Sequence, residues 1–412
     1  MSSPNTATSN VTIAAPADLT AYHDLGSQYF GPFLHAYVAW LRNQVAEIRP
    51  ERILFLSRDG YMMQRAYELM EQSDKDHSLG IPSAYVHFSR ASLRQPLLWT
   101  KSTFQETFQL LSWQRYVTLR EVLAFWGLTT EEANEVADAQ RAKGVDIDHA
   151  VFAYEQLPQS PELEALYAQW QSVINERSRA QYQALGAYLE QIGMRGRVVI
   201  VDIGWHGTMQ HCLEQLLAIY GIEAQVVGLY VGIDKQKNFS GEARGFVYDN
   251  ERPDRKTDIL SFLGVVEKLF QSCEGSAVAY LQDAQGTAHP TLAPYEYEAY
   301  PFMVQQITAM QQGALECLGQ RLAQGTEPSD ADVDHFLNLG KNPSLRQTAM
   351  FRSFFNIDND IKFFLLPQKP LWHYTPRQFV LALNQSQWKT GFMRQAFKMP
   401  LPYHFIYKLL KR

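Results

Sequence analysis

The stretch that decides the fold is RVVIVDIGWHGT, residues 197–208. It begins with a short, nearly continuous apolar run that ends at Asp202, and Gly204 and Gly207 follow before helical spacing resumes. Apolar runs that are continuous rather than alternating are typical of strands buried on both faces of a sheet. The stretch therefore predicts a buried strand, a glycine-bearing turn, and a helix from Thr208 to Tyr220.

Other segments repeat this strand-to-helix pattern. Residues 52–56 (RILFL) form a short apolar run bounded by turn residues, and helical spacing resumes over 61–72. Two further apolar runs, 84–88 (AYVHF) and 225–233 (QVVGLYVGI), have the length of strands. Strands that alternate with helices predict an α/β fold, with a doubly wound, mostly parallel sheet covered on both faces.

The composition along the chain predicts four parts. Residues 21–101 and 197–285 carry the strand pattern and form the expected α/β core. Residues 102–196 are rich in Glu, Gln and Ala without a clear strand, which predicts an all-α insertion that serves as a lid or an acceptor site. Residues 286–412 are mostly helical in pattern, and residues 1–20 have the composition of a disordered leader rather than of a signal peptide.

The overall composition excludes several protein classes. A chain of 412 residues that is 46% hydrophobic can bury a large core. A formal charge of −6 argues against nucleic acid as a partner, because such proteins carry a broad basic surface. The three cysteines show no CxxC spacing, so we expect neither a disulfide framework nor a thiolate zinc site, and a cytoplasmic location. No apolar stretch reaches the roughly 18 residues of a membrane span.

The C-terminal segment 388–412 differs from the rest of the chain. It contains no acidic residue, and its basic and aromatic residues alternate along the sequence. These are Lys389, Arg394, Lys398, Lys408, Lys411, Arg412, Phe392, Phe397, Tyr403, Phe405 and Tyr407. The combination suits peripheral contact with an anionic membrane. The alternative is a tail helix that docks on the core and leaves its lysines in water.

The turn over residues 202–208 has the features of a phosphate-binding loop. Gly204 and Gly207 allow close backbone approach, Thr208 offers a hydroxyl, and the next helix directs free N–H groups at the loop. Asp202 is placed to accept hydrogen bonds from sugar hydroxyls or to hold a metal. His206 is a candidate general acid or base. The alternative is a tight turn in which the glycines are only structural, and the spacing matches neither a Walker loop nor a dinucleotide fingerprint.

A second turn, Ser57-Arg58-Asp59-Gly60, places a guanidinium and a carboxylate at another strand end. Arg58 can bind a diphosphate through two parallel hydrogen bonds, and Asp59 can orient Mg²⁺-bound waters or act as a base. The alternative is an ion pair between these two residues that fixes the turn.

Further polar residues follow other expected elements. Ser89 and Arg90, with Arg94 nearby, add positive charge at a third strand end, although a surface arginine pair is the alternative. Glu267 and Lys268 lie on an expected helix and are weaker candidates.

The motifs FLSRDGY (55–61), SRASL (89–93), VDIGWHGTMQ (201–210) and EKLF (267–270), in this order, resemble those of a bacterial family. The family is similar to the phosphoribosyltransferases of capsule and O-antigen (ribofuranose) biosynthesis. Its members are often labelled as haloacid-dehalogenase-like hydrolases, and the resemblance covers roughly residues 22–285. It implies a phosphoribosyltransferase-like fold and a glycosyltransferase that moves ribofuranosyl 5-phosphate from 5-phosphoribosyl-1-diphosphate to a glycan.

The resemblance also implies roles for the residues. Asp202 and the turn Ile203-Gly204-Trp205-His206-Gly207-Thr208 would hold the ribose hydroxyls and the 5-phosphate. The turn from Ser57 to Gly60 would hold the diphosphate with Ser89 and Arg90, and Glu267 and Lys268 would contact the acceptor or support the site. Mg²⁺ would be carried largely by the donor, with a weak contribution from Asp59. Either Asp59 or Asp202 would take the acceptor proton.

The sequence differs from the usual phosphoribosyltransferase pattern in the loop that would bind ribose. That loop normally has two adjacent acidic residues, whereas this chain has only Asp202, with Trp205-His206 after it.

Three other functions are alternatives. A haloacid-dehalogenase-like phosphatase needs a nucleophilic aspartate where this chain has Ser57. A nucleotide-sugar glycosyltransferase needs a metal-binding Asp-x-Asp, which is absent, and a non-catalytic scaffold of a polysaccharide assembly complex would not need an intact site. For the transferase, the expected partners are a glycan acceptor, lipid-linked if the tail is an anchor at the inner membrane, and a separate phosphatase that acts on the product.

Overall fold

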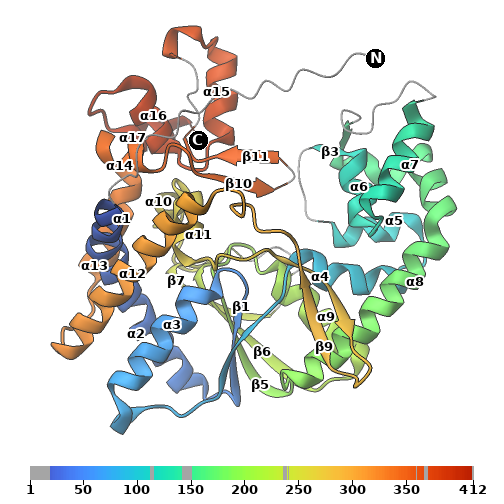
Figure 1. Cartoon of the computed structure of the whole chain (residues 1–412), viewed down its shortest axis with the longest axis horizontal. Coiled ribbons are helices and arrows are strands. Elements are labelled where there is room, and N and C mark those ends of the chain that lie inside the picture. Colours follow the sequence, from blue (N-terminus) through green and yellow to red (C-terminus); the bar gives the residue numbers. More distant parts are fainter. Residues whose placement is uncertain are drawn as a thin grey trace.

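The centre of the molecule is a five-stranded, fully parallel sheet with the strand order β2-β1-β5-β6-β7 (Figure 1). The computed structural model describes residues 19–111, 116–141, 151–234, 239, 241–358, 360–365 and 370–410. The strands are β1 (Arg52–Leu56), β2 (Ser83–Val86), β5 (Gly196–Asp202), β6 (Ala224–Gly232) and β7 (Glu242–Tyr248). Four of the five lie where the sequence pattern predicts them.

The strand order reverses between β1 and β5. From β1 the chain passes outward to β2, and it then returns across β1 to β5 and continues through β6 to β7. In open parallel sheets, such a reversal leaves a crevice at the carboxyl ends of the two strands. The turns after β1 and β5 are the two that the sequence singles out.

Helices cover both faces of the sheet. Phe55, Val199 and Val201 belong to the hydrophobic core under α2 (Gly31–Ile48), α3 (Gly60–Ser73), α12 (Pro301–Ala323) and α13 (Asp330–Lys341). Leu54 and Ile200 belong to the core on the opposite face, under α4 (Arg90–Arg94), α8 (Pro161–Gln191) and α9 (Thr208–Tyr220). Alternate side chains of each strand therefore enter two different cores, and the predicted α/β class is confirmed.

The expectation of an all-α insertion over 102–196 is wrong in one respect. Its helices are α5 (Phe104–Thr107), α6 (Leu119–Phe125), α7 (Thr130–Arg141) and α8, but β3 (Tyr116–Thr118) pairs antiparallel with β4 (Val151–Ala153). Strands of three residues are too short to show a period. In addition, α8 packs Leu185 and Leu189 into the same core as the sheet, so the insertion is not a separate folding unit. Residues 112–115 and 142–150 lie outside the described part of the chain.

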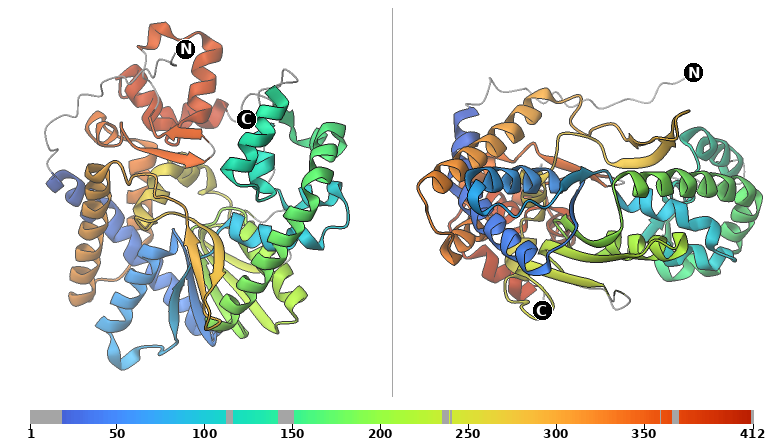
Figure 2. Two further views of the ribbon diagram at one scale, coloured as in Figure 1. Left: turned by 45° about the vertical axis from the view of Figure 1, so that its right-hand side comes forward. Right: turned by 90° about the horizontal axis from the view of Figure 1, so that it is seen from below.

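The chain after the central sheet contains two antiparallel hairpins, β8 (Ala277–Gln282) with β9 (Ala288–Leu292) and β10 (Phe355–Asp358) with β11 (Asp360–Phe363). Strands β9, β10 and β11 lie within residues 286–412, so that part is less purely helical than its pattern suggests. The remaining helices are α10 (Lys256–Leu260), α11 (Leu263–Phe270), α14 (Leu345–Met350), α15 (Pro376–Gln385), α16 (Lys389–Phe397) and α17 (Tyr403–Leu410). Figures 1 and 2 place the β10–β11 hairpin beyond the carboxyl edge of the sheet, with the insertion to one side.

At the start of the described chain, α1 (Leu19–Leu25) continues through one π-helical turn, Gly26–Phe30, into α2. Leu19 and Thr20 are therefore helical, and residues 1–18 of the predicted leader lie outside the described residues. Pro32 does not break the helix: it lies in the first turn of α2, directly after the π-helical turn. No helix of the described chain is long and apolar enough to cross a bilayer.

Candidate functional site

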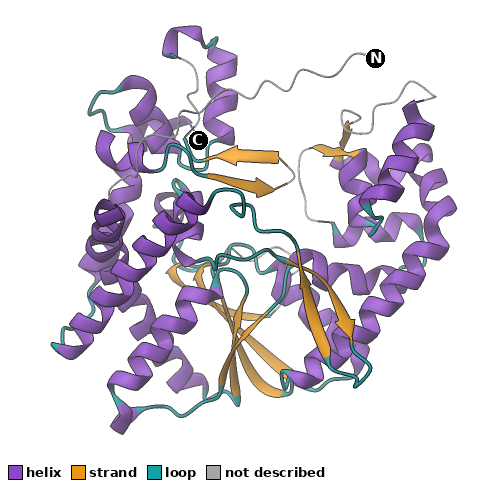
Figure 3. Cartoon of the chain, in the orientation of Figure 1, coloured by secondary structure: helices purple, strands orange, loops and turns teal. Residues whose placement is uncertain are grey.

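A cavity of about 590 Å³ lies at the carboxyl ends of β1 and β5. Figure 3 shows the loops that gather along this edge of the sheet. The predicted site residues that line the cavity are Ser57, Arg58, Asp59, Ser89, Arg90, Asp202, Ile203, Gly204, Trp205, His206, Gly207, Thr208 and Glu267. The fold thus brings three turns and one helix, widely separated in the sequence, to a single cavity at the point where the strand order reverses.

The turn after β5 depends on its two glycines. Gly204 has a φ of +127°, and a Cβ atom there would lie 2.0 Å from the carbonyl oxygen of Gly232. Gly207, at φ +69°, is the N-cap of α9 and gives no side-chain cap. Because the first N–H groups of a helix have no acceptor within it, the start of α9 presents unused donors and a positive dipole end to the cavity. The peptide bonds Ser57–Arg58 and Gly204–Trp205 are cis.

Three carboxylates face this cavity, on Asp59, Asp202 and Glu267. Asp202 is only 2% exposed, and its Oδ1 atom has no hydrogen-bond partner among the described residues. The Oδ1 atom of Asp59 is likewise buried without a partner there. Buried polar atoms in native proteins are almost always hydrogen-bonded, so two unpaired carboxylate oxygens in one cavity indicate a polar ligand.

Burial raises the pKa of all three carboxyl groups, and the charge of Asp59 adds to this effect for Asp202 and Glu267. Burial raises the pKa of Asp59 to about 6, against the opposing effect of nearby cations such as Arg58. Burial and then the charge of Asp59 raise the pKa of Glu267 to about 7. The same two causes raise the pKa of Asp202 well above its ordinary range. Such raised pKa values in one cleft are typical of functional sites, because a bound cation or hydroxyl group relieves the repulsion.

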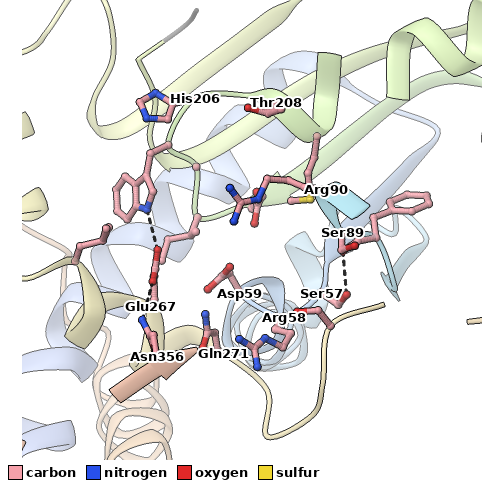
Figure 4. A pocket seen from close by; sticks show the side chains of 18 of the residues that line it. Ser57, Arg58, Asp59, Ser89, Arg90, His206, Thr208, Glu267, Gln271 and Asn356 are labelled. Atoms are coloured by element: carbon pink, nitrogen blue, oxygen red, sulfur yellow. Dashed lines mark hydrogen bonds between the residues drawn. The ribbon is translucent and has the colours of Figure 1, made fainter. Parts of the chain in front are cut away.

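Glu267 is held by hydrogen bonds from two separate elements (Figure 4). The indole Nε1 of Trp205 donates to one carboxylate oxygen at 3.2 Å, and the amide of Asn356 donates to the other at 3.3 Å. Trp205 is itself stacked on Tyr248, with ring centroids 6.2 Å apart. Glu267 therefore links the turn after β5 to the β10–β11 hairpin and fixes one wall of the cavity.

The guanidinium of Arg58 is held by partners within the protein. Its Nη1 atom is 2.5 Å from the carboxylate of Glu296 and donates to the carbonyl of Glu274 at 3.1 Å. Glu296 also pairs with Lys268, which is 1% exposed and does not line the cavity. Burial raises the pKa of Glu296, but Lys268 and then Arg58 outweigh it and lower the pKa overall. The alternative interpretation, an ion pair between Arg58 and Asp59, is not what the structure shows: Arg58 belongs instead to a buried network with Glu296 and Lys268 that braces the turn.

Arg90 is the more accessible cation. It is exposed at the start of α4, and no hydrogen bond or ion pair holds its guanidinium within the described part of the chain. Figure 4 shows Arg90, Asp59 and Glu267 around the same space. Arg94, by contrast, is buried and does not line the cavity. Of the predicted arginines, Arg90 is therefore the one placed to bind an incoming anion.

Several other predicted residues have structural contacts. The hydroxyl of Ser57 donates to the carbonyl of Phe88 at 3.3 Å, and that of Ser89 caps α4 and donates to the carbonyl of Ala277 at 2.6 Å. Gly60 lies beneath the site, where a Cβ atom would be 2.8 Å from the backbone of Phe55, and does not line the cavity.

His206 is exposed at the rim, 3.4 Å from the carbonyl of Asp234 and away from Asp59 and Glu267 (Figure 4). This position favours a binding or structural role over proton transfer among the carboxylates.

One part of the cavity wall was not predicted from the sequence. It consists of Asn356, Ile357, Lys362 and Gln387, which come from the C-terminal region that was expected to be helical. Other lining residues that the sequence did not single out are Phe88, Met209, Tyr230, Leu263, Gln271 and Ser276. The described residues of 102–196 line no part of it, so the expected lid lies elsewhere in this structure. Among these residues, only Gln271 could have been predicted from the sequence: it follows Glu267 by four residues, so the two lie on the same side of the helical turn.

The described residues contain no group of three or more His, Cys, Asp or Glu side chains placed to hold a metal ion. Asp59 and Asp202 each have one free carboxylate oxygen, and hard cations such as Mg²⁺ bind oxygen ligands. The site fits a magnesium ion only if the bound ligand supplies most of the coordination.

In chemical terms, the cavity offers helix N–H groups and Arg90 to anions and buried carboxylates to hydroxyl groups. A ligand that carries both phosphate and hydroxyl groups would use all of these features. The chain matches none of the protein-family models with which it was compared, and no curated protein matched it.

Proposed function

We propose that this protein is a phosphoribosyltransferase that uses 5-phosphoribosyl-1-diphosphate as donor. One observation carries the proposal: the uncapped start of α9 lies beside the buried, unpaired Oδ1 atom of Asp202 in a single cavity. The helix N-terminus suits the 5-phosphate, and the carboxylate suits the ribose hydroxyls. Few ligands other than a phosphorylated sugar need an anion site and a hydroxyl acceptor side by side.

The diphosphate has a complementary site across the strand reversal. Arg90 is exposed on that side, and the turn after β1 is braced by the Arg58–Glu296–Lys268 network. A guanidinium matches the planar geometry of phosphate oxygens. The strand order supports a doubly wound, phosphoribosyltransferase-like core, in which the donor would span the crevice between β1 and β5.

The charges of the cavity suit substitution at C1 of the ribose. The bond from C1 to the diphosphate oxygen breaks, and a bond from C1 to the acceptor hydroxyl oxygen forms. Positive charge that develops on the ring is stabilised by the carboxylates, and negative charge on the leaving group by Arg90. We assign Asp59 as the base that takes the hydroxyl proton, because its pKa of about 6 leaves it ionised yet moderately basic near pH 7.

Mg²⁺ fits this proposal as an ion bound mainly by the donor diphosphate. It would supply charge neutralisation of the leaving group. The chain's own contribution is to hold the donor phosphates and the ribose.

The acceptor and the cellular setting follow from the sequence resemblance. Its motifs are similar to those of enzymes that add ribofuranose to capsule and O-antigen glycans, so we propose a glycan acceptor in the cytoplasm, at or near the inner membrane. The product would keep its 5-phosphate, which requires a separate phosphatase. The haloacid-dehalogenase-like alternative gains no support, since Ser57 stands at the position of the nucleophile and its hydroxyl donates to Phe88.

The proposal is tested by supplying purified protein with Mg²⁺, glycan acceptors and one donor at a time. We expect diphosphate release from 5-phosphoribosyl-1-diphosphate, and none from nucleotide sugars. Asp202→Asn should abolish the release, whereas Asp283→Asn, on the exposed turn between β8 and β9, should leave it unchanged. Turnover of a nucleotide sugar instead, or equal activity of Asp202→Asn, would contradict the proposal.

A further inference from the structure

The charges of the chain are strongly segregated along the sequence. The 52 residues after Asp360 contain nine of the 37 Lys and Arg residues and none of the 43 Asp and Glu residues. The rest of the protein is therefore considerably more acidic than the formal charge of −6 suggests. This basic segment includes α15, α16 and α17.

These three helices form a small unit that is docked on the core. Leu383, Phe392, Met393 and Tyr403 make a separate hydrophobic cluster at their centre. One side of α17 is fixed by Asp258, whose carboxylate is 2.8 Å from His404 and 2.7 Å from Lys408. The orientation of α17 on the protein is thus defined by an apolar contact, a hydrogen bond from His404 and the ion pair of Lys408.

The other side of α17 is apolar and exposed. Leu401, Phe405 and Leu409 follow one another at four-residue spacing and are 43%, 62% and 52% exposed. Met399, in the turn before the helix, is 51% exposed, and Lys398 beside it is also exposed. Residues four apart lie on the same face of a helix, so Phe405 and Leu409 form one stripe, which Leu401 extends at its start.

This concentration of apolar surface is unusual within the described chain. Sixteen large hydrophobic residues are exposed there, and seven of them lie between Trp372 and Leu409. Trp372, at 81%, is the most exposed of all. Scattered single apolar residues need no explanation, but an exposed apolar stripe on one helix, with the exposed Lys398 before its start, indicates a surface that binds something.

We propose that α17 and the turn before it dock the protein on the surface of an anionic lipid bilayer. A second copy of this unit would bring the same positive charge and be repelled, whereas an anionic bilayer offers negative headgroups beside an apolar interior. Short helices with an apolar face and flanking lysines bind in this way, with the apolar side chains at the level of the headgroups. The inference does not depend on the reaction that the cavity performs.

The test is co-sedimentation of the full chain with vesicles of phosphatidylcholine alone or with about one third phosphatidylglycerol. The variant Phe405→Ser/Leu409→Ser removes the apolar stripe. The matched control is Val278→Ser/Leu281→Ser on β8. It also replaces two exposed apolar residues, 39% and 63% exposed, but more than 100 positions before α17 in the sequence. Lys398→Glu changes one exposed charge and leaves the stripe intact.

We expect wild type and the β8 control to bind the anionic vesicles, more weakly at high salt, and not the neutral ones. Phe405→Ser/Leu409→Ser should bind at least about fivefold more weakly, and Lys398→Glu measurably more weakly, with unchanged melting temperatures. Absence of wild-type binding, or full binding by both variants, would overturn the inference. An acidic protein would then be the remaining candidate partner for the exposed surface of α17. Activity on a soluble acceptor should be the same in all four proteins, which separates this test from that of the proposed reaction.

Discussion

Asp202 illustrates the tension between stability and function at a single residue. Its carboxylate is 2% exposed, one oxygen has no partner in the described structure, and Asp59 repels it. A buried charge in this situation destabilises a folded protein unless a ligand compensates it. We therefore interpret the residue as part of a binding site that is completed by sugar hydroxyls.

The first prediction concerns Asp202→Asn. The pKa of Asp202 is raised in the folded protein, whereas in the unfolded chain this residue ionises at about pH 4. Above that pH the ionisable carboxyl therefore favours the unfolded chain, and replacing it with a neutral amide removes this cost. The variant should melt at a higher temperature than wild type at pH 7.5 while it loses at least about a hundredfold in transfer rate. Differential scanning calorimetry and diphosphate release measure the two effects. A lower melting temperature together with full activity would be the opposite of what we expect.

A second prediction is a dependence on pH. Asp59 and Glu267 have pKa values of about 6 and about 7, so they become charged as the pH rises through this window. The transfer rate should rise over the same window and level off above about pH 8, because the ionised forms stabilise the ribose cation. The free energy of unfolding changes in the opposite direction. The contribution of these two groups to stability is most favourable below about pH 4, and it declines as the pH rises through their folded-state pKa values. Asp59→Asn should flatten both profiles.

Gly204 supports a third prediction. Its φ of +127° and the 2.0 Å approach of the Gly232 oxygen leave no room for a side chain. Gly204→Ala should cost about 2 kcal/mol or more of unfolding free energy and abolish donor binding. Gly221→Ala is the matched control, since Gly221 has a φ of +67° but open space around it. The control should lose about 1 kcal/mol in a urea titration and keep its affinity for the donor.

At the scale of elements, the Arg58–Glu296–Lys268 network ties the turn after β1 and helix α11 to the segment after β9. The fourth prediction is that Glu296→Gln costs about 3–5 kcal/mol, because it leaves buried Lys268 without its partner. The double variant Lys268→Met/Glu296→Leu should recover part of this loss, which a double-mutant cycle in urea would measure. Additive losses would mean that the network is not energetically coupled.

The elements nearest to the site were the most predictable from sequence. The run Val198 to Val201, followed by glycines, could be recognised as a buried strand and turn, and the limits of α9 were predicted without error. Strand β7 was missed because Arg244 and Gly245 interrupt its apolar pattern. Strands β3 and β4 were missed because three residues show no periodicity.

The details of the side chains were less predictable than the backbone. Arg58 and its partner Glu296 are 238 residues apart in sequence, and no local pattern connects them. Asn356, which holds Glu267, lies 89 residues away from it. Local spacing shows which residues end at the same edge of a sheet, but tertiary packing decides which of their charges remain free.

At the scale of the whole molecule, the C-terminal part has two functions in this account. Its β10–β11 hairpin covers the cavity, and its last helices carry the basic, apolar surface. The backbone of Trp388 bonds to that of Phe364, immediately beyond β11, so the two parts are directly joined. We propose that the cavity binds an anionic sugar and that the neighbouring helical unit binds a membrane, where a lipid-linked glycan would be found.

Donor binding, measured by isothermal titration calorimetry at pH 8 with Mg²⁺, is the most direct test of the central claim. We predict that 5-phosphoribosyl-1-diphosphate binds wild type and Asp283→Asn equally, and that Asp202→Asn binds it at least about tenfold more weakly, as expected for the loss of a charged hydrogen bond. Ribose 5-phosphate should bind more weakly than the donor but depend on Asp202 in the same way. No detectable binding of the donor to wild type, or equal binding by Asp202→Asn, would contradict the assignment of the cavity to a phosphorylated ribose.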